Sequence, residues 1–418
     1  MSSAAPQAIA VSKALEAVLR QDRGRLMAAL TYRLHSFQLA EDALQEASIS
    51  ALVHWGREGL PHSPQGWLIR VAFRKALDQL RTDGRSAERD TQLHLINELL
   101  GEDEPEAIPD ERLRLIFTCC HPALELKSRV ALTLRTVCGL STSDITRLFL
   151  DTEPTMGQRL SRAKAKIASI GTAYAAPEPD EWDERLQAVL TTVYLIFTTG
   201  YTARSADNSR DLCDEALFLA RLLLALRPDQ PEVEGALALM LLTDARRTAR
   251  VSTSGATVPP AEQDRSLWDG SKVTEGRQLL ETALGRKRAG PFQVKAAISA
   301  CQMTELPLPA EGAPATVDWP QILQLYTVLL AMEPTPVVRV NLAVALAETG
   351  NLTAAQAMLN TLSESLADFQ PFYAAQAAVF AKTGDKSAAQ RAYGAAIALA
   401  SNDSDRLFLE SQIKRLAI

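Results

Sequence analysis

The stretch Leu140–Ile167, LSTSDITRLFLDTEPTMGQRLSRAKAKI, decides the fold class that we predict for this chain. Its pattern predicts two short helices joined by a tight turn. Ser141 is a suitable N-cap for the first helix, with Asp144 three residues further on. Asp151 or Thr152 is a suitable N-cap for the second helix, in whose first turn Pro154 is tolerated. The stretch is therefore predicted to be a helix pair.

The second predicted helix has one apolar face and one basic face. Met156, Leu160, Ala163 and Ile167 recur at offsets of four, three and four, which predicts a buried stripe. Four Lys and Arg residues and no acid lie between residues 154 and 168, in a chain of net charge −6. Such a helix fits the major groove of DNA, and a solvated helix without DNA contact is the alternative. The candidates for DNA binding are Thr155, Gln158, Arg159, Arg162, Lys164 and Lys166.

The whole chain follows the same helical pattern. It has 418 residues, enough for two or three domains, and only 6% of them are aromatic. Short runs of alternating Val, Ile, Thr and Tyr are scarce, so we predict an all-α fold. Residues 1–175 hold 22 Lys and Arg against 21 Asp and Glu, and the remainder holds 22 against 29. Basic character is therefore restricted to patches in the N-terminal part.

The five cysteines indicate a reducing compartment, and the first residues of the chain do not resemble a secretion signal. The N-terminal residues lack the charged start and apolar run of a signal peptide, and the cysteines are scattered, so we expect a cytoplasmic protein. Cys119, Cys120 and His121 invite a metal interpretation, but their spacing is not that of a zinc site. We interpret these cysteines as core residues and expect no metal and no cofactor.

Two helices are predicted before residue 82. The first, FQLAEDALQEASISALVHW from Phe37, carries an acidic stripe that is either a solvated face or a docking face for a partner. A loop rich in Gly and Pro follows, and then WLIRVAFRKALDQLR from Trp67, which carries cations outside its apolar stripe. Cations beside aromatic rings suit single-stranded nucleic acid, and solvated arginines beside core aromatics are the alternative. Residues 83–111 contain the run GEDEPEAIPDE and are predicted to be an acidic linker.

Two features stand out in the part after residue 176. Glu348-Thr349-Gly350 recurs as Lys382-Thr383-Gly384, and Ala354-Ala355-Gln356 recurs as Ala388-Ala389-Gln390, both at a spacing of 34 residues. This is the tetratricopeptide period, and its signal is clearest over residues 319–418. The second feature is the loop Gln263–Asp269. We interpret Asp264 and Asp269 as helix caps and Trp268 as an anchor, with a ligand contact or a catalytic pair as the alternative.

Together, FQLAEDALQEA, WLIRVAFRKALDQLR and LSTSDITRLF…TMGQRLSRAKAKI resemble a sigma factor of the extracytoplasmic-function type, over about residues 12–170. The resemblance implies region 2 at 1–82, the acidic linker at 83–111, region 4 with a helix-turn-helix at 112–175, and a tetratricopeptide-like extension at 176–418. Asp42, Gln45 and Glu46 would then bind core RNA polymerase. The minus-ten element would meet Trp55, Arg57, Trp67, Arg70, Arg74, Lys75 and Arg81, with a flipped base in the loop from Trp55 to Pro64. The six candidates on the basic helix would bind the minus-thirty-five element.

The resemblance departs from the family pattern at two positions. Arg74 stands where Asn is common, and Gly157 stands where Lys is common. Gly157 removes one cation and costs about 1 kcal/mol of helix propensity relative to Ala.

The resemblance implies promoter-specific initiation without catalysis. The expected partners are promoter DNA and core polymerase, and the extension is expected to be a regulator that binds a protein or peptide. The alternative is a helical-repeat adaptor whose N-terminal helices contact only protein.

Overall fold

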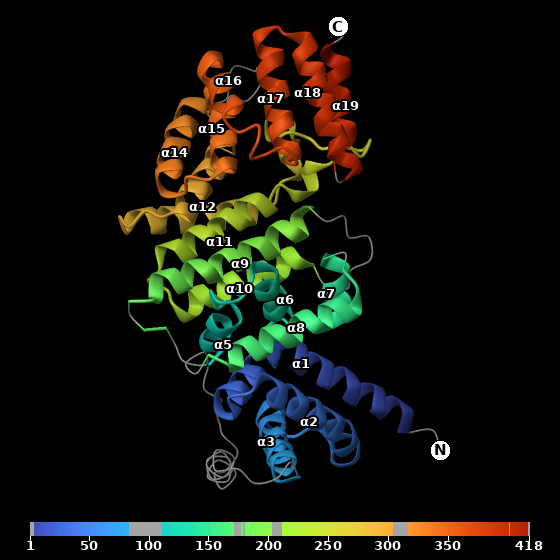
Figure 1. Ribbon diagram of the computed structural model, residues 1–418. Coiled ribbons are helices and arrows are strands. Elements are labelled where there is room, and N and C mark those ends of the chain that lie inside the picture. The colour runs from blue at the N-terminus through green and yellow to red at the C-terminus, as the bar shows by residue number, and fades with distance from the viewer. Residues whose placement is uncertain are drawn as a thin grey trace. The chain divides into compact units, whose positions relative to one another are not determined.

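A computed structural model describes residues 4–82, 111–149, 151–170, 177–178, 180–202, 211–303, 317–400 and 402–416. The predicted linker therefore lies outside the described residues, except for Glu111. The chain forms two compact units, residues 1–216 and 217–418. Within the described ranges every regular element is a helix, apart from one isolated bridge between Val251 and Thr257. The predicted all-α fold is thus confirmed (Figure 1). Over those same ranges, no helix is long and apolar enough to cross a lipid bilayer.

Three helices form the first part of unit one: α1 (Ala4–Leu34), α2 (Phe37–Glu58) and α3 (Pro64–Thr82). Ser36 begins α2, because its hydroxyl accepts a hydrogen bond from the amide of Leu39 at 3.2 Å. Gly59 ends this helix with a φ of 89°, a conformation that glycine adopts without strain. The buried side of α2 consists of Phe37, Ala40, Ala43, Leu44, Ala47, Ala51 and Trp55, which pack against α1 and α3.

The helices α5 (Arg112–Cys119), α6 (Leu126–Thr136), α7 (Thr142–Phe149) and α8 (Glu153–Ala168) form the second part of this unit. Ser141 and Asp144 make the predicted capping box: the Ser141 hydroxyl accepts from the Asp144 amide at 3.0 Å, and the Asp144 carboxylate accepts from the Ser141 amide at 3.2 Å. Thr152, one of the two predicted caps, accepts from the amide of Thr155. Cys119 and Cys120 are buried, as predicted.

The helix α9 (Trp182–Thr202) also belongs to the core of this second part. The Trp182 ring meets Phe117 of α5 edge-on, with centroids 4.9 Å apart. Arg185 is buried and donates a hydrogen bond to the carbonyl oxygen of Phe117 at 3.1 Å. The next helix, α10 (Leu212–Leu226), runs across the boundary of the two units. α5 and α6 therefore share their core with a helix that follows the predicted region 4.

Unit two begins around α11 (Pro231–Asp244), which is buried on nearly every side and packs against α12 (Gly270–Gly285) and α13 (Pro291–Cys301). The predicted caps of the intervening loop are confirmed. Asp264 accepts from the amide of Ser266, and Asp269 accepts from the amides of Ser271 and Lys272. Trp268 packs on a small core of Leu242, Ala245 and Met303. These contacts give the charged residues of the loop a structural role.

A stack of helices completes unit two: α14 (Trp319–Met332), α15 (Pro336–Glu348), α16 (Leu352–Asn360), α17 (Gln370–Thr383), α18 (Lys386–Ala398) and α19 (Asp403–Leu416). α15 and α17 begin 34 residues apart, as do α16 and α18. Gly350 and Gly384 both have positive φ, 88° and 81°, at the turn within each pair. Glu348 and Lys382, also 34 residues apart, form an ion pair at 3.1 Å.

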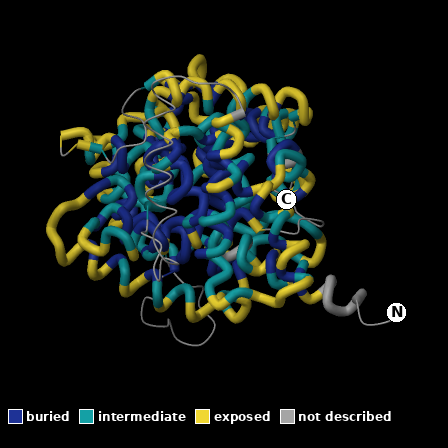
Figure 2. Tube along the Cα trace, turned by 90° about the horizontal axis from the view of Figure 1, so that it is seen from below, coloured by how far each residue is buried: buried dark blue, intermediate teal, exposed yellow. Residues whose placement is uncertain are grey.

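The end of the stack is joined to the loop before α12. Thr257 donates its hydroxyl to Asp405 at 2.6 Å and its amide to the carbonyl oxygen of Ser404 at 3.0 Å. Glu262 and Arg415 form an ion pair at 3.4 Å. Figure 2 shows that buried positions follow the inner sides of the helices, whereas the turns and outer faces are exposed.

Candidate nucleic-acid interface

The exposed residues of α8 form one continuous face. Thr155, Gln158, Arg162 and Lys166 are exposed and follow one another at offsets of three and four, so they share one side of the helix. We call these four residues the outer stripe. Met156, Leu160, Ala163 and Ile167 are buried, which confirms the predicted apolar stripe. The structure thus brings together four of the six residues predicted on this helix to bind DNA.

Arg159 lies at the edge of the outer stripe and is already paired with acids. It is half-buried, and its guanidinium lies 3.4 Å from the Asp151 carboxylate and 3.5 Å from the Glu125 carboxylate. Asp151 is in the turn before α8 and Glu125 precedes α6, so these ion pairs join the middle of α8 to that turn and to the start of α6. In the structure Arg159 orients α8.

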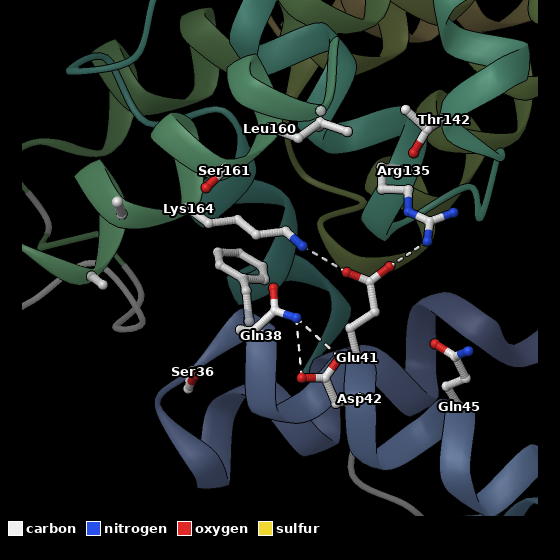
Figure 3. Close-up of a pocket in the computed structure, with 14 residues that line it drawn as sticks. Ser36, Gln38, Glu41, Asp42, Gln45, Arg135, Thr142, Leu160, Ser161 and Lys164 are labelled. Atoms are coloured by element: carbon white, nitrogen blue, oxygen red, sulfur yellow. Dashed lines mark hydrogen bonds and ion pairs between the residues drawn. The ribbon is translucent and has the colours of Figure 1, made fainter. Parts of the chain in front are cut away.

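Lys164 lies on a different side of α8 and points to α2 (Figure 3). Its ammonium nitrogen donates to Glu41 Oε2 at 2.6 Å, although the two residues are 123 positions apart in sequence. Lys164 is nine residues after Thr155, which places it half a turn away from the outer stripe. The structure therefore does not bring Lys164 together with the other predicted DNA-binding residues.

Three cations from three helices converge on Glu41. Besides Lys164, Arg135 of α6 lies 2.6 Å from Glu41 Oε1, and Arg23 of α1 lies 3.6 Å from the same oxygen. Burial alone would raise the pKa of Glu41. The hydrogen bond from Lys164 and the charges of Lys164, Arg135 and Arg23 outweigh burial, so the pKa is lower than that of an ordinary glutamate. Glu41 is thus held as a carboxylate.

A cavity of about 550 Å³ adjoins this cluster, between α2 and α8. Gln38, Asp42 and Gln45 line it from α2, and Gly157 and Ser161 line it from α8. Asp42 accepts two hydrogen bonds from the Gln38 amide nitrogen, both at 3.0 Å. Two of the three residues predicted to bind polymerase therefore lie beside α8. The third, Glu46, is exposed and lies 3.8 Å from the Lys75 ammonium of α3.

Trp67, Arg70, Arg74 and Arg81 of α3 are at offsets of three, four and seven, which places them on one side of the helix. Arg74 and Arg81 are exposed, Trp67 and Arg70 are half-buried, and the Trp67 ring stacks on His54 at 5.4 Å. Lys75 lies off this side, beside Glu46. Arg57 is exposed in the last turn of α2. Most of the residues predicted at the minus-ten element are thus on or near one basic face.

Trp55 is the exception, and the prediction for it needs correction. Its side chain is fully buried and meets Trp67 edge-on, with centroids 5.5 Å apart. The reason is that α2 continues to Glu58, which keeps Trp55 in register with the buried stripe that begins at Phe37. The loop itself is only residues 59–63. In this structure Trp55 offers no ring surface to a base.

Sequence reasoning missed Glu41, Arg135 and Arg23. Glu41 stands next to Asp42 in the acidic stripe, and no local pattern distinguishes the two carboxylates. Only the approach of α8 and α6 shows that Glu41 is the residue that takes ion pairs from distant parts of the chain.

Comparison with known proteins relates two segments of the chain to protein families. Residues 18–86 match the model for sigma-70 region 2, and residues 185–284 match a family of unknown function (DUF6596). The "Uncharacterized protein R00370" of Rhizobium meliloti (strain 1021) is 38% identical over 412 residues, which cover 96% of either chain. The chain belongs to the family of this rhizobial protein. No solved structure matches it.

In our chain α2 and α3 lie within the segment that matches sigma-70 region 2. The resemblance of the N-terminal helices to a sigma factor is therefore confirmed for region 2. The DUF6596 segment contains α10 and α11 and most of α9 and α12. Sequence reasoning did not predict this segment as a separate family. The extracytoplasmic-function subgroup and the tetratricopeptide-like character of the extension stay predictions.

Proposed function

We propose that this chain is an RNA polymerase sigma factor of the extracytoplasmic-function type, which directs initiation at selected promoters. The main support for the proposal is the match to sigma-70 region 2, because this domain supports a sigma-factor-like role in transcription initiation. The side of α3 that holds Trp67, Arg70, Arg74 and Arg81 would contact the separated strand. Cations would follow its phosphates, and the Trp67 ring would stack on a base.

In this proposal α7 and α8 are the helix-turn-helix of region 4. Three residues separate the two helices, and α8 presents a polar and basic outer stripe. Thr155, Gln158 and Arg162 would approach base edges in the minus-thirty-five element, while Lys166 would contact phosphate. Arg159 would keep α8 in position through Asp151 and Glu125.

Asp42, Gln45 and Glu46 of α2 would bind core polymerase. The factor would perform no covalent chemistry and would act in the cytoplasm. The part after residue 176 would regulate it, and the 34-residue recurrence of helix starts and of the Gly350 and Gly384 turns supports a tetratricopeptide-like array there.

Mixing the tagged full-length chain with core polymerase, followed by initiation on a promoter library, tests the proposal. Stable association and transcripts from a defined subset of promoters are expected. A chain that never associates with core polymerase is not a sigma factor. The repeating helix pairs would then favour the second candidate, an adaptor that binds other proteins.

A further inference from the structure

The two parts of the first unit, α1–α3 and α5–α9, are called its two halves here. They are joined by ion pairs that the proposed function does not use. Glu41 belongs to region 2, whereas Arg135 and Lys164 belong to the second half, and the ion pairs between them measure 2.6 Å each. The Glu41 side chain is 15% exposed and that of Lys164 is 18% exposed. Such partly desolvated pairs are stronger than ion pairs in open solvent.

A second set of contacts brings the same halves together without using Glu41. A Cβ added to Gly24 of α1 would lie 3.1 Å from the carbonyl oxygen of Val137, which follows α6. Glycine therefore permits a close approach that any larger residue would hinder. Arg114 of α5 also covers the ring of Tyr32 of α1, with its guanidinium carbon 4.4 Å from the ring centroid. Steric fit and charge thus favour the same arrangement.

The arrangement affects the face of α2 that would receive polymerase. Asp42 and Gln45 line a cavity of about 550 Å³ whose other wall is α8. A space of this size encloses a small ligand, whereas a helix with its side chains is about 10–12 Å across. A polymerase helix that packs on Asp42 and Gln45 inside this cavity therefore requires α8 to move away from α2.

We propose that Glu41 is an internal clasp that keeps the first unit closed, so that core polymerase engages α2 only after Glu41 releases Lys164 and Arg135. Opening would free two cations and the cavity side of α2 in one step. A partner whose acidic residues compete for Lys164 and Arg135, or whose basic residues compete for Glu41, would favour the open form. What opening achieves rests on the proposed function, but the closed contact itself does not.

Two variants open the clasp by different means. Glu41→Gln removes the carboxylate charge and keeps the side-chain size. Gly24→Leu leaves all four charged residues in place and forces α1 away from Val137, at a position where leucine also favours the helix. Glu16→Gln is the matched control, since Glu16 is exposed on α1 and accepts a hydrogen bond from Ser12 of the same helix.

Distances between labelled cysteines report the closed form directly. Gln79→Cys on α3 and Lys127→Cys on α6 place labels on exposed positions of the two halves, and the five native cysteines are buried. In the full-length chain we expect Glu41→Gln and Gly24→Leu to give a longer and broader distance distribution than the parent and Glu16→Gln. Affinity for core polymerase should rise about fivefold to tenfold in the same two variants, in the lower range of conformational coupling.

The outcomes separate the clasp from the proposed function. An unchanged distance in both variants overturns the clasp, whatever the polymerase result. A longer distance without a gain in affinity shows that closure does not control polymerase binding, which overturns the inference and leaves the sigma-factor proposal standing. A longer distance in a chain that binds no polymerase in any form refutes the proposed function and the control of polymerase binding with it.

Discussion

At the scale of single residues, the two arginines of α8 differ more than their sequence positions suggest. Arg162 is exposed on the outer stripe, and its guanidinium donates to the carbonyl oxygen of Gln158 in the same helix. Arg159 is half-buried between Asp151 and Glu125. An exposed cation is available to a phosphate or a base edge, whereas a paired cation has less to offer a ligand.

Arg162→Ala should therefore weaken binding to duplex promoter DNA by about 1–3 kcal/mol and lower the salt slope of binding by about 1. Arg159→Ala should instead lower the thermal stability of the first unit, because it removes two ion pairs that position α8. Binding isotherms at several salt concentrations, with thermal unfolding of each variant, distinguish the two effects. Equal loss of DNA affinity with unchanged stability in both variants would contradict this assignment.

The Glu41 carboxylate gives the closed form a defined dependence on pH. The pKa of Glu41 is lowered in the closed form and returns toward the ordinary glutamate value, about 4.5, when the clasp opens. The ionised Glu41 carboxylate therefore stabilises the closed form fully at pH values above the ordinary pKa of glutamate. This stabilisation is lost as pH falls through the lowered pKa of Glu41. Arg23, Arg135 and Lys164 face the carboxylate from α1, α6 and α8.

The label distance between α3 and α6 should thus be constant from neutral pH down to about pH 5 and should lengthen in more acidic solution. Glu41→Gln should remove this acid-dependent step and give one distance throughout. Asp42 lies at the same cavity, so Asp42→Asn is the control that should keep the step. A step that survives in Glu41→Gln would assign it to another carboxylate.

At the scale of elements, Trp55 of α2 and Trp67 of α3 contact each other but differ in burial and in the role that we expect for them. Trp55 continues the buried stripe of α2, while Trp67 lies in the first turn of α3 and is half-buried on the side that carries the cations. One ring supports the domain, and the other is placed to meet a ligand.

Trp55→Ala should lower the free energy of unfolding of region 2 by about 3–5 kcal/mol, the usual cost of deleting a buried ring of this size. Trp67→Ala should cost less stability and should weaken binding to single-stranded DNA of the minus-ten type by about 1–3 kcal/mol. Chemical denaturation and fluorescence binding assays measure the two quantities. If Trp67→Ala binds single strands as well as the parent does, the ring does not stack on a base.

Sequence patterns predicted the features that depend on neighbouring residues. The stripe Met156–Ile167 and the caps Ser141, Thr152, Asp264 and Asp269 follow from helix periodicity and from hydrogen bonds to nearby amides. Contacts between distant segments left no such signal. Lys164 and Glu41 are 123 residues apart, so the sequence pattern assigns Lys164 to the DNA-binding face, whereas the structure places it against α2. The prediction for Trp55 is wrong because α2 continues to Glu58, past the residue at which the sequence pattern predicts the loop to begin.

At the scale of the whole chain, the first unit does not end where region 4 was predicted to end. Trp182 and Arg185 of α9 complete the core around Phe117, so part of the predicted extension stabilises α5 and α6. A deletion that tests regulation must therefore keep α9.

A chain that ends at residue 178 should unfold at lower temperature and be cleaved by protease near α5, because Phe117 would lose its cover. A chain that ends at residue 226 keeps α9 and α10 and should retain the folded first unit. Differential scanning calorimetry and limited proteolysis compare the two. Only the longer form can show whether the remaining helices control transcription, and identical stability of both forms would contradict the structural role of α9.

The contacts between Thr257 and Asp405 and between Glu262 and Arg415 give the second unit an unusual property. Helical arrays in which each repeat touches only its neighbours fray from their free ends, because terminal repeats have one partner instead of two. Here α19, the last helix that the structure describes, is fastened to a loop that precedes α12, so this end of the array is held by a second partner. Its helices should therefore melt together in one cooperative transition, and strain applied at α19 would reach α11 and α12 without passing through every intervening pair.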